Sequence, residues 1–230
     1  MKPFENAKSL GKAGIIARFK PLHNGAKLML EYTCKNADYV LIGIGSVNKY
    51  NMRNPFTFEE TKDMLETQGY LQNVPHNIIQ LYDSGHIPEF RDGKKWKLQI
   101  EEKFRGIDNI VTANPYVTKL LEDKFKIVHP STLIPKDEWQ YIKATQVRVE
   151  MARNHNWQAL VPEKVADYIM KNKLDDRFRK EFGLEVLANT LGKEYWKHEN
   201  VEDEMKNVRT PYVVDKNNIA SDKNELHTMS

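Results

Sequence analysis

The sequence predicts an α/β protein in which helices flank a mostly parallel sheet. Short apolar runs alternate with segments of helical spacing through the first three quarters of the chain. This alternation is typical of strands joined by crossover helices, which leave consecutive strands parallel to one another. The polar motifs best suited to bind a ligand come just after predicted strands, where ligands bind in sheets of this kind.

Five apolar runs are the predicted strands, and in chain order they span residues 14–17, 38–45, 78–82, 109–112 and 125–128. The second run is apolar almost throughout, as expected of a strand that is buried on both faces. The first run ends at Arg18, where a polar segment that contains a proline begins.

Six helices are predicted between and after these runs, over residues 26–37, 57–68, 94–104, 116–123, 145–153 and 162–171. Thr57 and Glu60 form a capping-box signature. Asn114 stands before a proline, a common helix entry, and Thr145 is a candidate N-cap because its hydroxyl can accept from a backbone N–H. Pro162 suits a first helical turn.

The 230 residues suffice for one domain with an appendage, because domains usually hold roughly 100–200 residues. We expect a leader over residues 1–12, the main domain over 13–173 and a C-terminal extension over 174–230. The extension is predicted to be helical at first and then to form a flexible tail, because it is mostly polar beyond Asn200. This tail accounts for part of the low apolar share of 40%.

Composition excludes several classes of protein. The 35 basic and 32 acidic residues nearly balance, so bulk charge does not indicate nucleic-acid binding. The single cysteine, Cys34, excludes a disulfide scaffold and a Cys-rich zinc site, and its helical setting favours a packed thiol over a reactive one. No stretch approaches the ~20 apolar residues of a membrane span, and the N-terminus lacks a secretory signal. We therefore expect a cytoplasmic protein without a membrane partner.

The loop after the first predicted strand is a candidate phosphate site. Gly25 allows a ligand to approach the backbone closely, and the helix that follows offers unpaired N–H groups with a partial positive charge. His23 can donate to a phosphate oxygen, and Arg18 and Lys20 add charge. The same residues also fit an ordinary strand-to-helix turn with a capping histidine.

A second candidate phosphate site opens the predicted helix at 145–153. The Thr145 hydroxyl either caps this helix or faces a phosphate. Lys143 and Arg148 flank it, and Arg148 lies three residues along the helix and shares its face. The alternative is a capped surface helix with solvated cations.

Together these segments resemble the nucleotidylyltransferase superfamily, in which HxGH follows the first strand and ISxTxxR opens a late helix. Here the two motifs read His23-Asn24-Gly25-Ala26 and Ile142-Lys143-Ala144-Thr145-Gln146-Val147-Arg148. From about residue 14 to 169 the chain is similar to the archaeal-type nicotinamide-nucleotide adenylyltransferases. Further matches in the same order are Gly43-Ile44-Gly45-Ser46, Arg53-Asn54-Pro55-Phe56-Thr57, Trp96, Asn114-Pro115 and the segment from Trp157 to Pro162.

The resemblance implies a Rossmann-like nucleotidylyltransferase domain and adenylyl transfer from ATP to nicotinamide mononucleotide (NMN), which yields NAD and pyrophosphate. The family forms no covalent intermediate and relies on positioning and charge stabilisation. Mg²⁺ is held mainly by the ATP phosphates, so no metal ligand is expected in the protein. The implied partners are ATP, a mononucleotide and a second copy of the chain, and no nucleic acid.

Residue roles follow by position in the motifs. The implied catalytic residues are His23, Arg148 and Lys20. The implied ATP-binding residues are Arg18, Phe19, His23, Gly25, Thr145, Gln146 and Arg148. The implied NMN-binding residues are Gly45, Ser46, Arg53, Trp96 and Asn114, with Arg53 at the phosphate and Trp96 on the nicotinamide ring.

Several of these residues have a structural alternative. Trp96 lies at helical spacing with Leu98 and Ile100 and fits a core position as well as a stacking one. Arg53 also fits a solvated loop cation, and Asn114 fits a simple helix entry. Asp83, after the third predicted strand, is a better candidate for a helix cap than for a site residue.

The chain departs from the family at four positions. Ala26 replaces the second histidine of HxGH, Lys143 replaces the serine of ISxTxxR, and Val149 and Thr61 replace basic residues. Loss of one preorganised donor typically lowers a rate ~10²–10³-fold, so Ala26 predicts reduced activity. Lys20 or Lys143 is expected to supply the missing charge, because a lysine is a compact cation.

These departures leave two alternatives to NMN adenylyl transfer. One is a related nucleotidylyltransferase with another phosphorylated acceptor, because the phosphate loops do not define the acceptor. The other is a catalytically weak nucleotide-binding or regulatory protein, which Ala26 favours.

Overall fold

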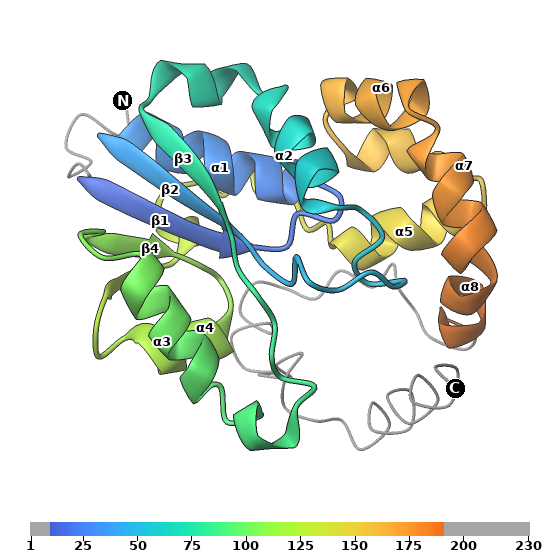
Figure 1. Cartoon of the computed structure of the whole chain (residues 1–230). Helices are drawn as coiled ribbons and strands as arrows, with labels where there is room; N and C mark the ends of the chain where they lie inside the picture. Colours follow the sequence, from blue (N-terminus) through green and yellow to red (C-terminus); the bar gives the residue numbers. More distant parts are fainter. Residues whose placement is uncertain (1–9, 191–230) are drawn as a thin grey trace.

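The computed structural model describes residues 10–190 and shows a parallel sheet between two layers of helices (Figure 1). Its five strands lie in the order β3-β2-β1-β4-β5, and every neighbouring pair is parallel. The strands are β1 (Lys12–Ala17), β2 (Tyr39–Ile44), β3 (His76–Gln80), β4 (Asn109–Val111) and β5 (Lys126–Val128). The predicted α/β class is confirmed.

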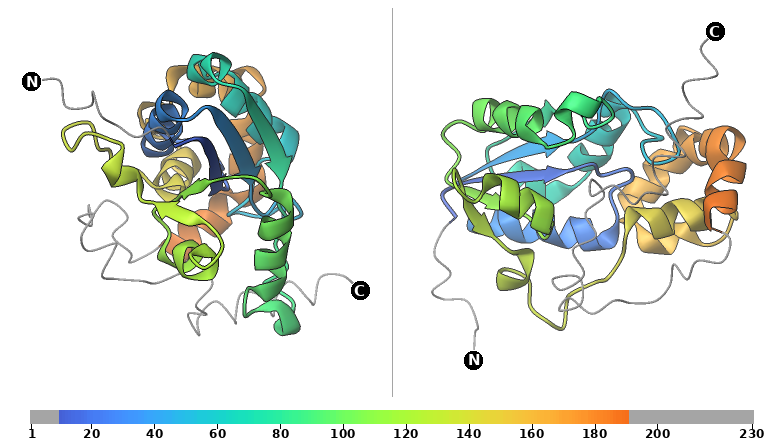
Figure 2. Two further views of the ribbon diagram at one scale, coloured as in Figure 1. Left: turned by 90° about the vertical axis from the view of Figure 1, so that its left-hand side faces the viewer. Right: turned by 90° about the horizontal axis from the view of Figure 1, so that it is seen from below.

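Strand order explains the two helical layers. The chain moves outward from β1 to β3 and then returns across the sheet to β4 and β5. Because parallel crossovers are right-handed, the helices of the two halves cover opposite faces. One face carries α1 (Asn24–Asn36), α2 (Phe58–Glu66) and α5 (Ala144–Ala152), and the other carries α3 (Lys94–Lys103) and α4 (Pro115–Leu121) (Figure 2).

The predicted strands and helices are all present, with bounds that shift by one or two residues. Strand β3 begins at His76, two residues before the predicted start, because an edge strand tolerates polar residues such as His76 and Asn77. Thr57 and Glu60 form the predicted capping box of α2. Asn114 caps α4, whereas Pro162 immediately precedes the first helical residue of α6 (Glu163–Lys171).

The C-terminal extension begins with α7 (Leu174–Phe178) and α8 (Leu184–Thr190), joined by a π-helical turn at Arg179–Gly183. Leu174, Phe178 and Val186 are buried in the main core, so this part packs onto the sheet domain. At the other end Leu10 is already buried before β1. Residues 1–9 of the predicted leader and residues 191–230 of the predicted extension, which include the predicted tail beyond Asn200, lie outside the described residues.

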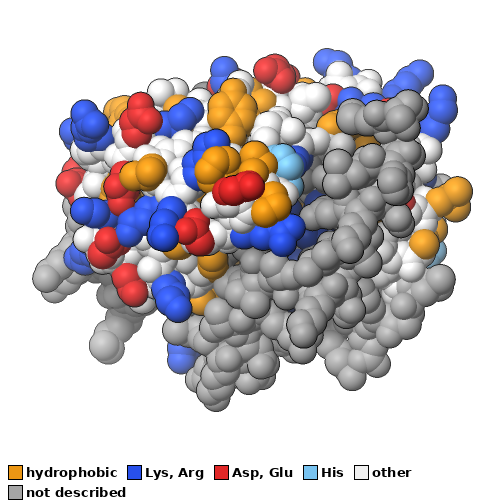
Figure 3. Space-filling view, turned by 60° about the horizontal axis from the view of Figure 1, so that its bottom comes forward, with side chains coloured by type: hydrophobic (Ala, Val, Ile, Leu, Met, Phe, Trp, Pro, Cys, Tyr) orange, Lys and Arg blue, Asp and Glu red, His pale blue; other side chains and the backbone are white. Residues whose placement is uncertain are grey.

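Other sequence-based expectations concern single residues and surfaces. Cys34 is buried in α1, and burial raises the pKa of its thiol to about 12, which confirms a packed thiol. Within residues 10–190 no helix is both long and apolar enough to cross a membrane. On the face shown in Figure 3, basic and acidic side chains are interspersed, as the nearly balanced charge predicts.

Candidate active site

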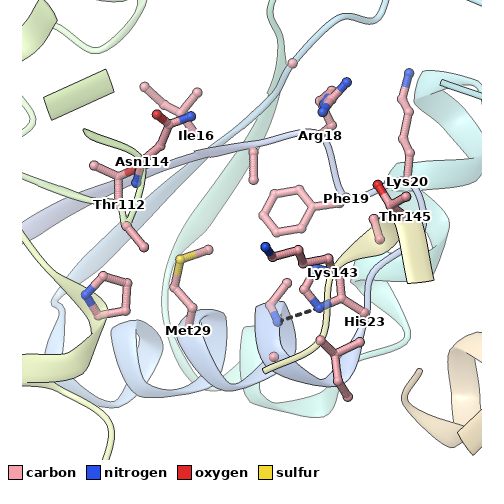
Figure 4. A pocket seen from close by; sticks show the side chains of 18 of the residues that line it. Ile16, Arg18, Phe19, Lys20, His23, Met29, Thr112, Asn114, Lys143 and Thr145 are labelled. Atoms are coloured by element: carbon pink, nitrogen blue, oxygen red, sulfur yellow. Dashed lines mark hydrogen bonds between the residues drawn. The ribbon is translucent and has the colours of Figure 1, made fainter. Parts of the chain in front are cut away.

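A pocket of about 900 Å³ lies at the carboxyl ends of β1, β2 and β4 (Figure 4). It falls where the strand order reverses between β1 and β4, the place where open α/β sheets bind ligands. Its volume matches the ~300–1,000 Å³ typical of small-molecule sites. The lining comes from the loop after β1, the turn after β2 and the starts of α1, α4 and α5.

His23 both caps α1 and lines the pocket. Its Nδ1 accepts from the Ala26 N–H at 3.2 Å, so in the neutral ring the proton is on Nε2. Burial and the Arg148 charge lower the pKa of His23 to about 4, which keeps the ring neutral at pH 7. The capping and ligand-binding roles are therefore compatible, because one ring nitrogen serves each.

Gly25 is required by the protein chain itself. A Cβ at this position would lie 2.6 Å from the carbonyl oxygen of Gln140 and 3.4 Å from that of Ile142. Gly25 also lines the pocket, so the expectation that its small size serves a ligand stays a prediction beside this structural role. The absent side chain lets the segment before α5 cross the first turn of α1, which brings the two motifs together.

Arg148 joins the two motifs directly. Its side chain is buried, Nη1 donates to the Lys20 carbonyl at 2.8 Å, and Nη2 donates to the Thr145 hydroxyl at 3.2 Å. The prediction that Thr145 is the N-cap is wrong, because α5 begins at Ala144 and Lys143 occupies the cap position. The Gln146 side chain accepts from the Lys143 N–H at 2.7 Å, which extends the helix to Ala144.

The two lysines of the motifs have different environments. Lys20 is buried and its Nζ donates to the Ser46 carbonyl at 3.3 Å; burial and the Arg18 charge lower its pKa to about 8. In Figure 4 the Lys20 side chain points away from His23, whereas the Lys143 side chain reaches into the pocket beside Phe19. The structure therefore distinguishes two residues that the sequence left equivalent.

Backbone conformation at two turns shapes the pocket. Phe19 after β1 and Ser46 after β2 have positive φ angles of 53° and 56°. Such conformations cost ~1–3 kcal/mol each in a non-glycine residue and cluster at functional sites. The Gly45 N–H donates to the Ala17 carbonyl at 2.9 Å, so the two turns are tied together.

The remaining predicted acceptor residues also converge on the pocket. Gly45, Ser46, Arg53, Trp96 and Asn114 all line it. Trp96 is half-buried against the second core cluster and also lines the pocket, so its stacking on a nicotinamide ring stays a prediction. Its predicted core neighbour Leu98 is 65% exposed, however, because it lies on the outer face of α3. Asn114 caps α4 through its Oδ1 and lines the pocket as well.

Two residues differ from the sequence-based expectation. Asp83 caps no helix; it accepts from the Ser46 hydroxyl at 3.1 Å and the Gly85 N–H at 2.8 Å, and so holds the turn after β2. Gln146 does not appear among the lining residues, because its side chain caps α5.

Sequence reasoning missed part of the lining. Thr112, whose hydroxyl accepts from the Asn114 N–H at 3.1 Å, lines the pocket with Met29, Trp139 and Tyr141. The two aromatic residues lie in an irregular segment with no periodic pattern. The only signal was their position just before the second motif.

The pocket is strongly cationic. Its described lining has no Asp or Glu and includes five basic side chains, those of Arg18, Lys20, Arg53, Lys143 and Arg148. Burial, Arg18 and Arg53 lower the pKa of Arg148, although a guanidinium stays protonated at neutral pH. A bound polyanion would relieve this repulsion. Among the described residues no cluster of three His, Cys, Asp or Glu could hold a metal ion.

Curated proteins of similar sequence match this chain along most of their length. A protein of Thermococcus sibiricus named nicotinamide-nucleotide adenylyltransferase is 29% identical over 179 residues, which cover 77% of this chain and 90% of that protein. One of the same name from Pyrococcus furiosus is 28% identical over 71% of this chain and 85% of its own. The chain is thus similar in sequence to nicotinamide-nucleotide adenylyltransferases over most of their length. No family model matches it.

A solved structure has a similar fold. The bifunctional NMN adenylyltransferase/ADP ribose pyrophosphatase of Francisella tularensis matches with a TM-score of 0.60 at 19% identity. The match covers 79% of this chain but only 56% of that one, so the present chain spans little more than half of the bifunctional protein.

Proposed function

We propose that the protein transfers the adenylyl group of ATP to NMN, forming NAD and pyrophosphate. The cationic pocket at the switch point of the sheet carries this proposal, because it has the charge that two phosphorylated substrates need. The names of the curated relatives identify the reaction that such a pocket supports.

In this reaction the 5′-phosphate of NMN attacks the α-phosphorus of ATP. A new P–O bond forms, the bond to the bridging oxygen breaks, and pyrophosphate leaves with the bonding electrons. Charge grows on the phosphate oxygens, and fixed donors that point at them lower the barrier. The His23 Nε2–H and the Arg148 guanidinium are the donors we assign to this task, with Lys143 as a third.

We assign one side of the pocket to each substrate. The ATP side consists of Arg18, Phe19, His23, Gly25, Thr145 and Arg148. The acceptor side consists of Gly45, Ser46, Arg53, Trp96 and Asn114. Lys20 and Gln146 instead position their neighbours, because Lys20 holds the Ser46 carbonyl and Gln146 caps α5.

Mg²⁺ enters as part of the ATP substrate in this proposal. The described lining offers phosphate-binding cations and no carboxylate, which fits a metal held by the phosphates. We further infer a cytoplasmic enzyme with ATP and a mononucleotide as its partners.

Ala26 favours a second candidate, a nucleotide-binding protein that turns over weakly. Its N–H is used by His23 and its methyl group offers the pocket no donor. Pyrophosphate release from MgATP, measured with NMN and separately with nicotinic acid mononucleotide, distinguishes the candidates. Release with NMN supports the main proposal, release with the other acceptor alone supports a different substrate, and ATP binding without release supports the weak form.

The variant Ala26→His measures what this position costs. If a missing donor limits the rate, kcat rises, by up to ~10²–10³-fold, which is the usual effect of one such group. An unchanged kcat would show that other residues already supply the charge.

A further inference from the structure

The C-terminal helices lie against the loop that joins β2 to α2, residues 47–56 (Figure 1). This loop carries Arg53, whose side chain lines the acceptor side of the pocket. Helices α7 and α8 come more than a hundred residues later in the chain, and neither contributes a described residue to the pocket lining.

The Asn51 side chain ties the tip of the loop together by hydrogen bonds. The Asn51 Oδ1 accepts from the Arg53 N–H at 3.0 Å, from the Asn54 N–H at 3.1 Å and from the Asn54 Nδ2 at 3.0 Å. The position of Arg53 therefore depends on whatever holds the loop as a whole.

Arg177 of α7 provides the main anchor. Its Nη1 and Nη2 donate to the two carboxylate oxygens of Glu60 at 2.5 and 2.8 Å, and Nη2 also donates to the Pro55 carbonyl at 3.0 Å. Glu60 in turn accepts from the Thr57 N–H at 2.9 Å. One guanidinium thus joins the end of the loop to the start of α2.

The Arg177–Glu60 contact is an ion pair as well as a pair of hydrogen bonds. The hydrogen bonds to Glu60 raise the pKa of Arg177. Burial alone would raise the pKa of Glu60, but its bonds with Arg177 and the Thr57 N–H outweigh burial and lower this pKa. Both groups are therefore ionised at neutral pH, and a bidentate pair of ions is stronger than a neutral hydrogen bond.

Further contacts hold the outer side of the loop. The Tyr50 hydroxyl donates to Glu181, and its ring meets the Phe182 ring edge-on at 5.3 Å between centroids. The Asn189 amide lies 3.5 Å from the Met52 sulfur. Helix α7, the π-helical turn and α8 therefore each contact the loop, at Pro55, Tyr50 and Met52 respectively.

We propose that Arg177 is a positioning residue for the acceptor: through Glu60 and Pro55 it holds the 47–56 loop so that Arg53 faces the mononucleotide phosphate. The proposal rests on the proposed function, because it needs a phosphorylated acceptor at Arg53. The ATP side depends instead on His23, which caps α1, and on Arg148 of α5. None of the hydrogen bonds described joins Arg177 to either residue.

The test compares Arg177→Ala with Arg179→Ala in the full chain. Arg179 is a matched control, since its ion pairs with Asp175 and Asp176 stay within the C-terminal segment. Hydrogen exchange of the backbone amides of residues 47–56 reports on the loop whether or not the protein is active. Steady-state kinetics with NMN and with ATP report on each substrate side.

We expect faster exchange in the loop of Arg177→Ala and a KM for NMN that rises about tenfold, because small misplacements of a binding group are costly. The KM for ATP should change little, and Arg179→Ala should leave both loop exchange and KM for NMN near wild type. Arg177→Lys should restore only part of the loss, because lysine keeps the positive charge but cannot form the bidentate bond to Glu60.

Three results would overturn the proposal. Unchanged loop exchange in Arg177→Ala would show that the anchor is dispensable. Equal effects in Arg177→Ala and Arg179→Ala would show a general loosening of the C-terminal helices. Faster exchange with unchanged KM for NMN would show that the loop does not serve the acceptor. A wild-type protein that releases no pyrophosphate would instead contradict the proposed function, while the exchange data would still test the anchor.

Discussion

His23 shows how one side chain in this protein serves structure and chemistry together. Its Nδ1 accepts the Ala26 N–H, which satisfies an unpaired donor at the start of α1 and directs the proton to Nε2. Arg148 likewise makes structural contacts, because its two terminal nitrogens donate to the Lys20 carbonyl and to the Thr145 hydroxyl. The groups that we propose to bind phosphate are therefore held in place by the protein itself, as electrostatic catalysis requires.

At the residue scale, the two lysines of the motifs should differ in kinetics. Lys143→Ala should lower kcat/KM on the order of 10²-fold, because its side chain reaches into the pocket and Ala26 offers no donor. Lys20→Ala should act mainly on stability, since its Nζ is committed to the Ser46 carbonyl. Pyrophosphate-release kinetics and thermal unfolding of both variants make the comparison.

Lys143→Arg is the control for charge and should keep most of the activity. If both alanine variants turn over like wild type, neither lysine compensates for the missing histidine. If Lys20→Ala loses more activity than Lys143→Ala, the assignment to Lys143 is wrong.

At the scale of elements, the site depends on the crossing of two segments. The chain before α5 passes over the first turn of α1, and the Gln140 carbonyl occupies the space that a side chain at Gly25 would need. The sequence placed a glycine there but gave no sign of the neighbour, because Gln140 lies in an irregular segment far along the chain. The same crossing accounts for the contact of Arg148 with the loop after β1.

Gly25→Ala should destabilise the protein and weaken ATP binding together. The new Cβ would stand 2.6 Å from a backbone oxygen, so the two segments must separate; overpacking of this kind usually costs ~1–3 kcal/mol. Urea unfolding and ATP titration measure the two effects.

The matched control is Gly69→Ala, because a Cβ at Gly69 meets nothing within 4 Å. We expect it to stay near wild type in both measurements. A Gly25→Ala variant that is as stable as Gly69→Ala and binds ATP normally would show that the crossing is not tight in solution.

At the scale of the whole molecule, stability should depend on pH through His23. Its folded pKa of about 4 lies below the usual value of 6.5, so between these values the unfolded chain binds more protons than the folded one. The free energy of unfolding contributed by this group is complete above pH 6.5 and falls as the pH falls towards 4.

The variant His23→Asn isolates this contribution, since asparagine keeps an oxygen that can cap α1 but does not titrate. Urea unfolding between pH 4 and pH 7 should give a smaller loss of stability on acidification for His23→Asn than for wild type. Parallel curves for the two proteins would mean that His23 titrates alike in the folded and unfolded states.

Local patterns determined much of this protein in advance. Apolar runs and helical spacing predicted the strands and helices within a few residues, because side-chain periodicity follows backbone geometry. The two motifs predicted where the pocket would lie, since segments after parallel strands meet at one edge of the sheet. Eleven of the twelve predicted substrate-binding residues line the pocket; the exception is Gln146.

Only the tertiary structure decided the direction of individual side chains. It separated Lys143 from Lys20, moved the cap of α5 from Thr145 to Lys143 and showed Gln140 against Gly25. It also placed Arg177 on the acceptor loop. These features depend on contacts between segments up to 122 residues apart, as between Arg177 and Pro55. Periodicity reports which face of an element is buried; it carries no information about which distant group a side chain will meet there.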